Sequence, residues 1–260
     1  MPDTAARPAP FTEIFANGGS TAITREIPVE APVALEFNGI AYAVMMATPV
    51  DLPDFVTGFA ITEQLVASAD EIEDIDVAET DKGWIVRAQL APRAAAPVLE
   101  RARRRVSESS CGLCGIENLE QIARPLPRIA DPLNVDAAAI FAALGALREQ
   151  QHLGRRTAAV HAAAFCDTTG RILNSREDVG RHNALDKLIG ALARAGTPAA
   201  DGVFLLTARC SYELVEKTVV AGGRALATIS APTTLALDRA KAAGLALHVL
   251  AREDSLLRVM

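Results

Sequence analysis

The most reactive side chains in the sequence are two cysteines near its middle, in the run Ser109-Ser110-Cys111-Gly112-Leu113-Cys114-Gly115. Two thiols that lie two residues apart can meet or share one bound group, and the neighbouring glycines allow backbone conformations that other residues resist. The arginines at positions 101 and 103–105 would stabilise a thiolate, lowering the pKa of a free thiol from about 8.5. Such a thiolate suits a nucleophile that takes up sulfur as a persulfide, which the second thiol could release or protect.

Other roles for this cysteine pair stay open from the residues alone. A zinc site would need two further ligands, and the sequence has no second Cys-x-x-Cys and no closely spaced histidine pair, only isolated Cys166, Cys210, His152 and His161. A thioredoxin-like redox site would lie between a strand and a helix, whereas this pair lies in a stretch rich in arginine and proline. The pair could also serve only for docking or structure.

A second group of polar residues follows the predicted strands of the C-terminal half, at 177–182, 208–211, 230–233 and 251–254. Because ligands of open α/β sheets bind beyond the carboxyl ends of parallel strands, we expect these loops to share one edge. Three of the loops open predicted helices, whose N-terminal amides attract anions. Arg181, Arg209 and Arg252 add positive charge suited to phosphate. The pattern predicts a site for a phosphorylated, polar ligand.

Simpler explanations exist for several of these polar residues. Ser211, Ser230 and Thr233 are ordinary helix-capping residues, so each loop taken alone need be no more than a cap. His161 lies in an apolar stretch, as core histidines do, whereas His182 at a predicted helix start is better placed to contact a ligand.

Two further cysteines and two lysines are not expected to react. Cys166 ends an apolar strand and is expected to be a small buried side chain, while Cys210 has no thiol neighbour and is assigned no role. Lys187 and Lys217 fall on predicted helices and are expected to be solvated.

The elements that must position these residues fall into four predicted regions. Residues 1–20, rich in proline, alanine and glycine, are expected to be a flexible tail. Residues 21–92 predict a small α+β domain, with strands around an Asn38-Gly39 turn, a helix over 51–66 capped by Asp51, and strands over 71–79 and 84–90. Residues 93–134 predict a connector that carries the cysteine pair.

Residues 135–260 predict an α/β domain. Helices are expected over 135–150, 182–195, 212–221 and 232–243, and strands over 158–166, 171–174, 203–207, 225–229 and 245–250. Strands that alternate with helices at this spacing are typical of an α/β layer with a largely parallel sheet.

Composition limits the possible classes of function. The 260 residues carry a net charge of −6, with a pI of about 5.3, which argues against a general nucleic-acid-binding protein. No apolar run is long enough for a membrane helix, and the first residues lack a secretory signal pattern, so we expect a cytoplasmic protein without a membrane partner. In that reducing compartment structural disulfides are not expected.

Several segments together resemble the formate dehydrogenase accessory sulfurtransferases, the FdhD family. They are the Cys111-Gly112-Leu113-Cys114-Gly115 run, the stretch from Glu177 to Gly190 that begins Glu-Asp-Val-Gly-Arg-His-Asn, and Ser230-Ala231-Pro232-Thr233. The Val160-His161-Ala162-Ala163 segment fits too, as does Arg209 followed by Ser211 and Glu213. The similarity runs from about Ile23 to the C-terminus, and the Glu-Asp-Val-Gly-Arg-His-Asn run is its most specific part.

The resemblance implies a fold and a function. The fold would be a cytidine-deaminase-like, three-layer α/β/α C-terminal domain with a small α+β N-terminal domain. Members of the family take sulfur from a cysteine desulfurase as a persulfide and pass it to the molybdenum cofactor, in its bis-molybdopterin guanine dinucleotide form, before insertion into formate dehydrogenase. A homodimer is implied, with GDP as a surrogate ligand. A cofactor-delivery chaperone without sulfur chemistry, or a zinc-binding scaffold, is the alternative.

The resemblance also assigns residues. Cys111 would carry the persulfide and Cys114 would assist, and no metal-binding residue is assigned. The residues expected to bind the cofactor are His161, Arg181, His182, Asn183, Arg209, Ser211, Ser230, Pro232, Thr233, Leu250, Ala251, Arg252, Glu253, Asp254 and Ser255.

One departure from the family pattern is visible, and one activity of the related fold is excluded. The family usually has Ser-Gly-Arg where this chain has Thr207-Ala208-Arg209, and alanine would be strained if that loop needs a positive φ. Deamination is not expected, because it needs His-x-Glu followed by Pro-Cys-x-x-Cys around zinc. Here Ala163 stands where the glutamate is needed, and the cysteine pair precedes His161.

Overall fold

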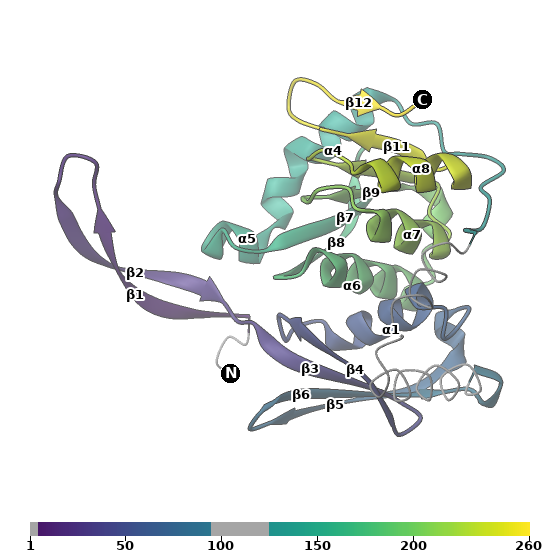
Figure 1. Cartoon of the computed structure of the whole chain (residues 1–260), viewed down its shortest axis with the longest axis horizontal. Helices are drawn as coiled ribbons and strands as arrows, with labels where there is room; N and C mark the ends of the chain where they lie inside the picture. Colours follow the sequence, from purple (N-terminus) through teal and green to yellow (C-terminus); the bar gives the residue numbers. More distant parts are fainter. Residues whose placement is uncertain (1–4, 95–124) are drawn as a thin grey trace, which may run out of the picture.

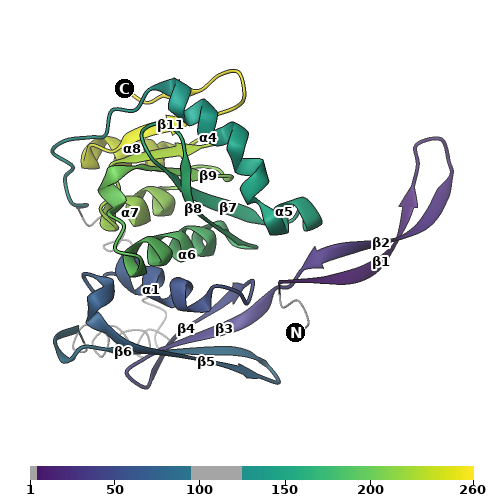
Figure 2. The same ribbon diagram turned by 180° about the vertical axis from the view of Figure 1, so that it is seen from behind.

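The computed structural model describes residues 5–94 and 125–260. The Cys111–Cys114 pair and most of the predicted connector therefore lie outside the described residues. The described chain forms a two-stranded arm, a four-stranded sheet with one long helix, and a six-stranded sheet with helices on both faces (Figures 1 and 2).

The arm is an antiparallel hairpin that projects from the rest of the molecule (Figure 1). It consists of β1 (Ala6–Ile14) and β2 (Ser20–Pro28), with a turn at Gly18, whose φ is 89°. The prediction of a flexible tail over residues 1–20 is wrong. Pro8 and Pro10, which suggested an irregular chain, are accommodated because each strand of a two-stranded ribbon has one unpaired side, where a missing N–H costs nothing.

The second unit is a sheet in the order β4-β3-β6-β5, covered by one helix. The predicted Asn38-Gly39 turn is confirmed, because Phe37 pairs with Ile40 and both turn residues have positive φ. Phe37, Phe55 and Phe59 form an aromatic cluster between sheet and helix. The elements are β3 (Ala31–Phe37), β4 (Ile40–Ala47), α1 (Leu52–Thr62), a 3-10 turn (Ala69–Glu71), β5 (Ile72–Thr80) and β6 (Gly83–Leu90).

The third unit is a six-stranded sheet in the order β12-β11-β10-β9-β7-β8. Alternate strand residues face α4 on one side and α6, α7 and α8 on the other. The elements are α4 (Ala137–Gln150), α5 (His152–Thr157), β7 (His161–Cys166), β8 (Ile172–Asp178), α6 (Arg181–Arg194), a 3-10 turn (Ala199–Asp201), β9 (Val203–Leu206), α7 (Tyr212–Val220), β10 (Ala225–Thr228), α8 (Thr234–Ala243), β11 (Ala246–Val249) and β12 (Leu257–Arg258).

The predicted α/β character is confirmed, but a largely parallel sheet is not observed. β9, β10 and β11 are parallel, whereas β7 is antiparallel to both of its neighbours and β12 is antiparallel to β11. β7 and β8 are joined by the tight Asp167–Gly170 turn, which returns the chain at once and so makes them antiparallel. The likeness to cytidine deaminases and the predicted domain boundaries remain predictions.

The two sheets are joined by a close crossing of α1 and α6 (Figure 2). A Cβ added at Gly58 would lie 1.8 Å from the Asp186 carbonyl oxygen, and one at Gly190 would lie 1.9 Å from the Asp54 carbonyl oxygen. Only glycine permits this approach. In the described parts of the chain, no helix combines the length and apolar character needed to cross a membrane.

Candidate functional site

Four loops meet at one edge of the six-stranded sheet. β8, β9, β10 and β11 point the same way, so the segments that follow them lie side by side. Backbone hydrogen bonds join them, from Cys210 N to Ala231 O (3.2 Å), Thr233 N to Cys210 O (3.0 Å) and Leu250 N to Ser230 O (3.2 Å). We call residues 179–183, 207–211, 229–233 and 250–255 the ligand edge.

His161 joins the ligand edge because β7 runs against β9. The first residue of β7 therefore lies where β9 ends, and His161 Nδ1 is 3.0 Å from the Thr207 carbonyl oxygen. The ring is only partly buried. The interpretation of His161 as a core histidine is therefore wrong, since strand direction places it at the edge.

The turn from Asp178 to Asn183 is held by buried polar contacts. The Asp178 carboxylate lies 2.7 Å from Lys187 Nζ and accepts hydrogen bonds from the backbone N–H groups of Gly180 and Thr48. The side chains of Asp178 and Lys187 are both fully buried. Glu177 and Asp178 belong to β8, which is longer than predicted. Lys187 is 0% exposed, so the prediction that it is solvated is wrong.

Lys217 is likewise held rather than solvated. Its Nζ lies 2.9 Å from the buried carboxylate of Asp186 and 2.9 Å from Thr62 Oγ1. Burial raises the pKa of Asp186, and the charge of Lys217 opposes that rise. Helix periodicity could not show that Lys187 is buried or that Lys217 is held by Asp186 and Thr62, because these contacts involve other elements.

The loop after β9 accommodates alanine at position 208. Ala208 is buried and is not among the residues with positive φ, so its backbone is one that any residue adopts. The neighbouring Thr207 Oγ1 accepts a hydrogen bond from Ala162 N (2.7 Å), which fixes the loop against β7. The expected strain at this position is therefore absent.

The loop after β11 has an unusual backbone. Leu250 has a φ of 49°, a conformation that costs a bulky residue energy and that concentrates at functional sites. Arg252 N donates to Ser255 O (2.8 Å), closing a turn whose side chains from Arg252 to Ser255 are exposed, while Ala251 is buried.

Three arginines of the ligand edge make no ion pair with the described residues. None of the ion pairs found there involves Arg181, Arg209 or Arg252. The Nε of Arg181 is buried and has no hydrogen-bond partner in this described part. A buried donor without an acceptor is costly, so this Nε–H is a donor that an acceptor on a bound ligand could satisfy.

Three helices begin at this edge, and their caps differ. Thr233 caps α8 through a hydrogen bond from Ala236 N, as its residue type predicts. Gly180 before α6 and Ser211 before α7 make no side-chain cap. Capping therefore explains Thr233 but not Ser211, and the first amides of α6 and α7 are available to an anion.

His182 and Glu213 form a pair between α6 and α7. His182 Nε2 lies 3.0 Å from a Glu213 carboxylate oxygen and 3.4 Å from Ser211 Oγ. Burial lowers the pKa of His182, and the neighbouring Arg181 and Lys217 lower it further against the opposing charge of Glu213. The lowered pKa favours the neutral ring, and in the tautomer that donates from Nε2–H to Glu213 the Nδ1 atom would be an acceptor.

The two described cysteines, Cys166 and Cys210, are buried and are therefore expected to be unreactive. Burial raises the pKa of Cys166 to about 11 and that of Cys210 to about 12. A thiol with such a pKa holds almost no thiolate at neutral pH, although Cys210 belongs to the ligand edge.

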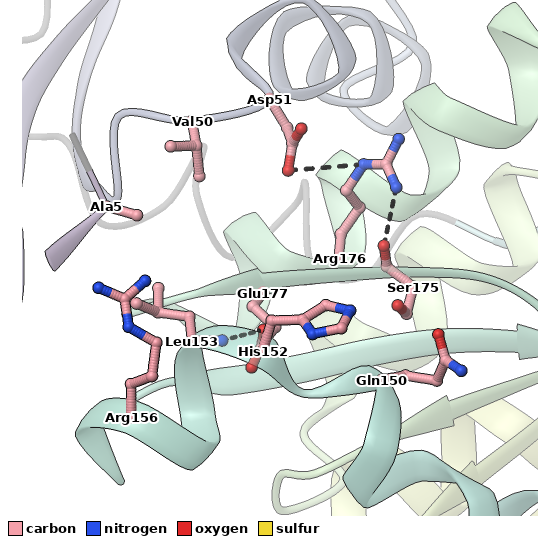
Figure 3. Close-up of a pocket in the computed structure, with 10 residues that line it drawn as sticks. All are labelled: Ala5, Val50, Asp51, Gln150, His152, Leu153, Arg156, Ser175, Arg176 and Glu177. Carbon is pink, nitrogen blue, oxygen red and sulfur yellow. Dashed lines mark hydrogen bonds and ion pairs between the residues drawn. The ribbon is translucent and has the colours of Figure 1, made fainter. Parts of the chain in front are cut away.

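A separate pocket of about 320 Å³ lies where the base of the arm, α5 and β8 meet (Figure 3). Its charged groups are already satisfied, since Glu177 accepts from Leu153 N and Gly154 N, and Arg176 binds Asp54. Asp51 lines it too, and lies near Arg176 instead of capping α1 as predicted. We assign this pocket no part in the ligand edge.

The described chain resumes at residue 125, and residues 125–136 lie at the edge of the sheet opposite the ligand edge. Ile129 N donates to Ala243 O (2.8 Å) at the end of α8, just before β11 begins. Figure 1 shows this teal segment on the side away from the loop that follows β11.

Comparison with known proteins matches residues 28–258 to the FdhD/NarQ family. A protein of Variovorax paradoxus named sulfur carrier protein FdhD is 45% identical over 230 residues, which cover 88% of this chain and 83% of the relative. A protein of the same name from Xanthomonas campestris is 41% identical over 256 residues, covering 97% and 91%.

A solved structure shows a similar fold. It is described as a formate dehydrogenase accessory protein from Desulfotalea psychrophila, and it matches with a TM-score of 0.76 at 22% identity, covering 98% of this chain and 96% of that one.

Proposed function

Because this chain belongs to the FdhD/NarQ family, we propose that it is a sulfur carrier for the maturation of formate dehydrogenase. Relatives more than 40% identical over most of both chains bear the name sulfur carrier protein. The residue pattern agrees, since a thiol pair flanked by arginines is the chemistry that a sulfur carrier needs.

In this proposal Cys111 accepts sulfur from the persulfide of a cysteine desulfurase. The Cys111 thiolate attacks the outer sulfur, the donor's S–S bond breaks, and the donor cysteine leaves as a thiolate, so that Cys111 keeps the sulfur as a persulfide. Cys114 assists by protecting or releasing that sulfur. Both cysteines lie outside the described residues, so their roles rest on the sequence and on family membership.

The recipient in this proposal is the molybdenum cofactor in its bis-molybdopterin guanine dinucleotide form, bound as substrate at the ligand edge. The observation that supports this most directly is the buried, unpartnered Nε of Arg181 at the start of α6. Arg209 and Arg252 add exposed positive charge, and uncapped amides at α6 and α7 add donors. These groups suit the phosphates of a guanine nucleotide.

Mass spectrometry tests the carrier function. After incubation with a cysteine desulfurase and cysteine, a mass increase of one sulfur atom, about 32 Da, is expected on Cys111. The measurement is repeated with and without GDP. If the desulfurase is shown to release sulfur but Cys111 stays unmodified, the carrier function is contradicted and the delivery-chaperone and zinc-scaffold alternatives are left.

A Cys111→Ala variant separates transfer from binding. It should remain folded and bind GDP, because the ligand edge does not contain Cys111, but it should yield cofactor without the transferred sulfur and an inactive formate dehydrogenase. Activation of formate dehydrogenase by this variant would refute the role of Cys111. Family resemblance also leads us to propose a homodimer, which light scattering of the purified protein measures.

A further inference from the structure

The Asp178 carboxylate organises the turn that carries Arg181 and His182. Its Oδ1 accepts from Gly180 N (2.7 Å) and Asn183 Nδ2 (3.0 Å), and its Oδ2 accepts from Thr48 N (3.0 Å) and Lys187 Nζ (2.7 Å). Both oxygens are therefore surrounded only by donors, a pattern that a carboxylate alone satisfies.

The same cluster reaches into the N-terminal unit at the end of β4. Lys187 Nζ donates to Thr48 O (2.8 Å), and Asn183 Nδ2 donates to Met46 O (2.8 Å). The backbone of the β4 end thus offers one donor and two acceptors to residues of β8 and α6. Asp178 and Lys187 are 0% exposed and Asn183 is 3% exposed, so water cannot replace these bonds.

The turn itself has no spare room. A Cβ added at Gly180 would lie 2.7 Å from Asn183 Nδ2, closer than such atoms approach in proteins. The position of Gly180 and of the α6 N-terminus is therefore set by the side chains of Asp178 and Asn183.

We propose that Asp178, Lys187 and Asn183 are positioning residues for anion binding, through which the end of β4 holds the α6 N-terminus in its ligand-binding position. The inference rests on the proposed function, since the ligand is the nucleotide end of the cofactor. In this proposal the N-terminal unit supports the ligand edge, although no residue of that unit belongs to the four loops.

The test compares two chemically identical substitutions near the same helix. In Asp178→Asn the new amide NH₂ faces donors on one side or the other, so the turn must rearrange. Asp186→Asn is the control, because Asp186 is also buried and paired with a lysine, but it binds Lys217 and Thr62 instead of the turn. GDP is the probe, and its Kd is measured by calorimetry at a temperature where both variants are folded.

We expect Asp178→Asn to weaken GDP binding at least tenfold, and Asp186→Asn to change it less than threefold while lowering the thermal midpoint comparably. Equal losses of affinity in both variants, or unchanged affinity in folded Asp178→Asn, would overturn the proposal. If Asp178→Asn does not fold, Asn183→Ala replaces it in the ligand-free exchange measurement described next, because that change removes the bonds to Met46 O and Asp178 without leaving a buried charge unpaired.

Hydrogen exchange in the ligand-free protein tests the positioning role independently of whether GDP is the ligand. The amides of Gly180, bonded to Asp178, and of Ala184, bonded to the Gly180 carbonyl, should exchange faster in ligand-free Asp178→Asn than in wild type, but not in Asp186→Asn. If wild-type protein does not bind GDP, the proposed ligand is wrong, yet exchange still decides whether Asp178 holds the turn. Unchanged exchange there contradicts the positioning role whether or not GDP binds.

Discussion

At the scale of single residues, the ligand edge contains a buried donor that lacks an acceptor among the described residues. Arg181 presents a buried Nε without a partner among the described residues, whereas Arg176 and Arg239 elsewhere are held by carboxylates. A guanidinium offers several donors in a fixed plane, while an ammonium is a point charge. Geometry as well as charge should therefore matter at Arg181.

An Arg181→Lys variant tests this distinction. It keeps the charge but removes the Nε–H, so we expect GDP affinity to fall by roughly tenfold or more, the equivalent of about 1.5–3 kcal/mol for a charge-assisted hydrogen bond. Arg7→Lys on the distant arm should leave affinity unchanged. A Kd for Arg181→Lys within a factor of two of wild type would show that charge alone suffices.

The buried thiols predict selective labelling. With pKa values of about 11 and 12, Cys166 and Cys210 should resist iodoacetamide in the native protein at pH 8 and react only after denaturation. Peptide mapping by mass spectrometry reads this directly. Rapid native labelling of Cys210 would mean that the loop after β9 opens in solution.

At the scale of elements, the crossing of α1 and α6 fixes the N-terminal unit against the ligand edge. The two helices approach closely because Gly58 of α1 faces the backbone of α6 and Gly190 of α6 faces the backbone of α1. Ion pairs from Asp54 to Arg176 and Arg194 surround the crossing. This contact brings Thr48 within reach of Asp178, so it also supports the α6 N-terminus.

Two glycine substitutions probe that crossing. Gly190→Ala would place a Cβ 1.9 Å from the Asp54 carbonyl oxygen and should lower the unfolding free energy by about 3 kcal/mol, because a backbone atom must move. Gly145→Ala in α4 meets nothing within 4 Å and should stabilise the protein by up to about 1 kcal/mol. Denaturant titration measures both, and a harmless Gly190→Ala would show that the helices separate easily.

At the scale of the whole molecule, buried histidines make stability depend on pH. Burial lowers the pKa of His248, as does Arg258, so below about pH 6.5 the unfolded chain binds a proton that the folded chain does not. His182 shifts in the same direction. Stability should therefore fall as pH drops from 6.5 to 5, by at most about 1.4 kcal/mol per pH unit for each histidine.

A His248→Asn variant should show a smaller loss over that pH range than wild type, as measured by urea unfolding at each pH. His152→Asn is the control, because His152 is exposed and keeps its solvent on folding. An identical pH slope in His248→Asn and wild type would mean that His248 is not the group responsible.

Features that depend on residues close in sequence were predicted correctly, and features that depend on distant contacts were not. The Asn38-Gly39 turn and the helices from Arg181, Tyr212 and Thr234 depend on neighbours a few residues away, and all were predicted. The arm was missed because strand pairing accommodated prolines that looked disruptive. The burial of Lys187 was missed because it depends partly on the end of β4, where the Thr48 carbonyl that accepts from Lys187 lies 139 residues away in sequence.

The sequence by itself determined which chemical groups are present and which of them belong to loops, because residue type and short-range periodicity decide both. The thiol pair, the arginines and the helix starts were all readable in this way. The tertiary structure decided strand direction, and with it the place of His161, and it placed the end of β4 behind the α6 N-terminus. Those outcomes depend on contacts between distant segments, which local patterns do not encode.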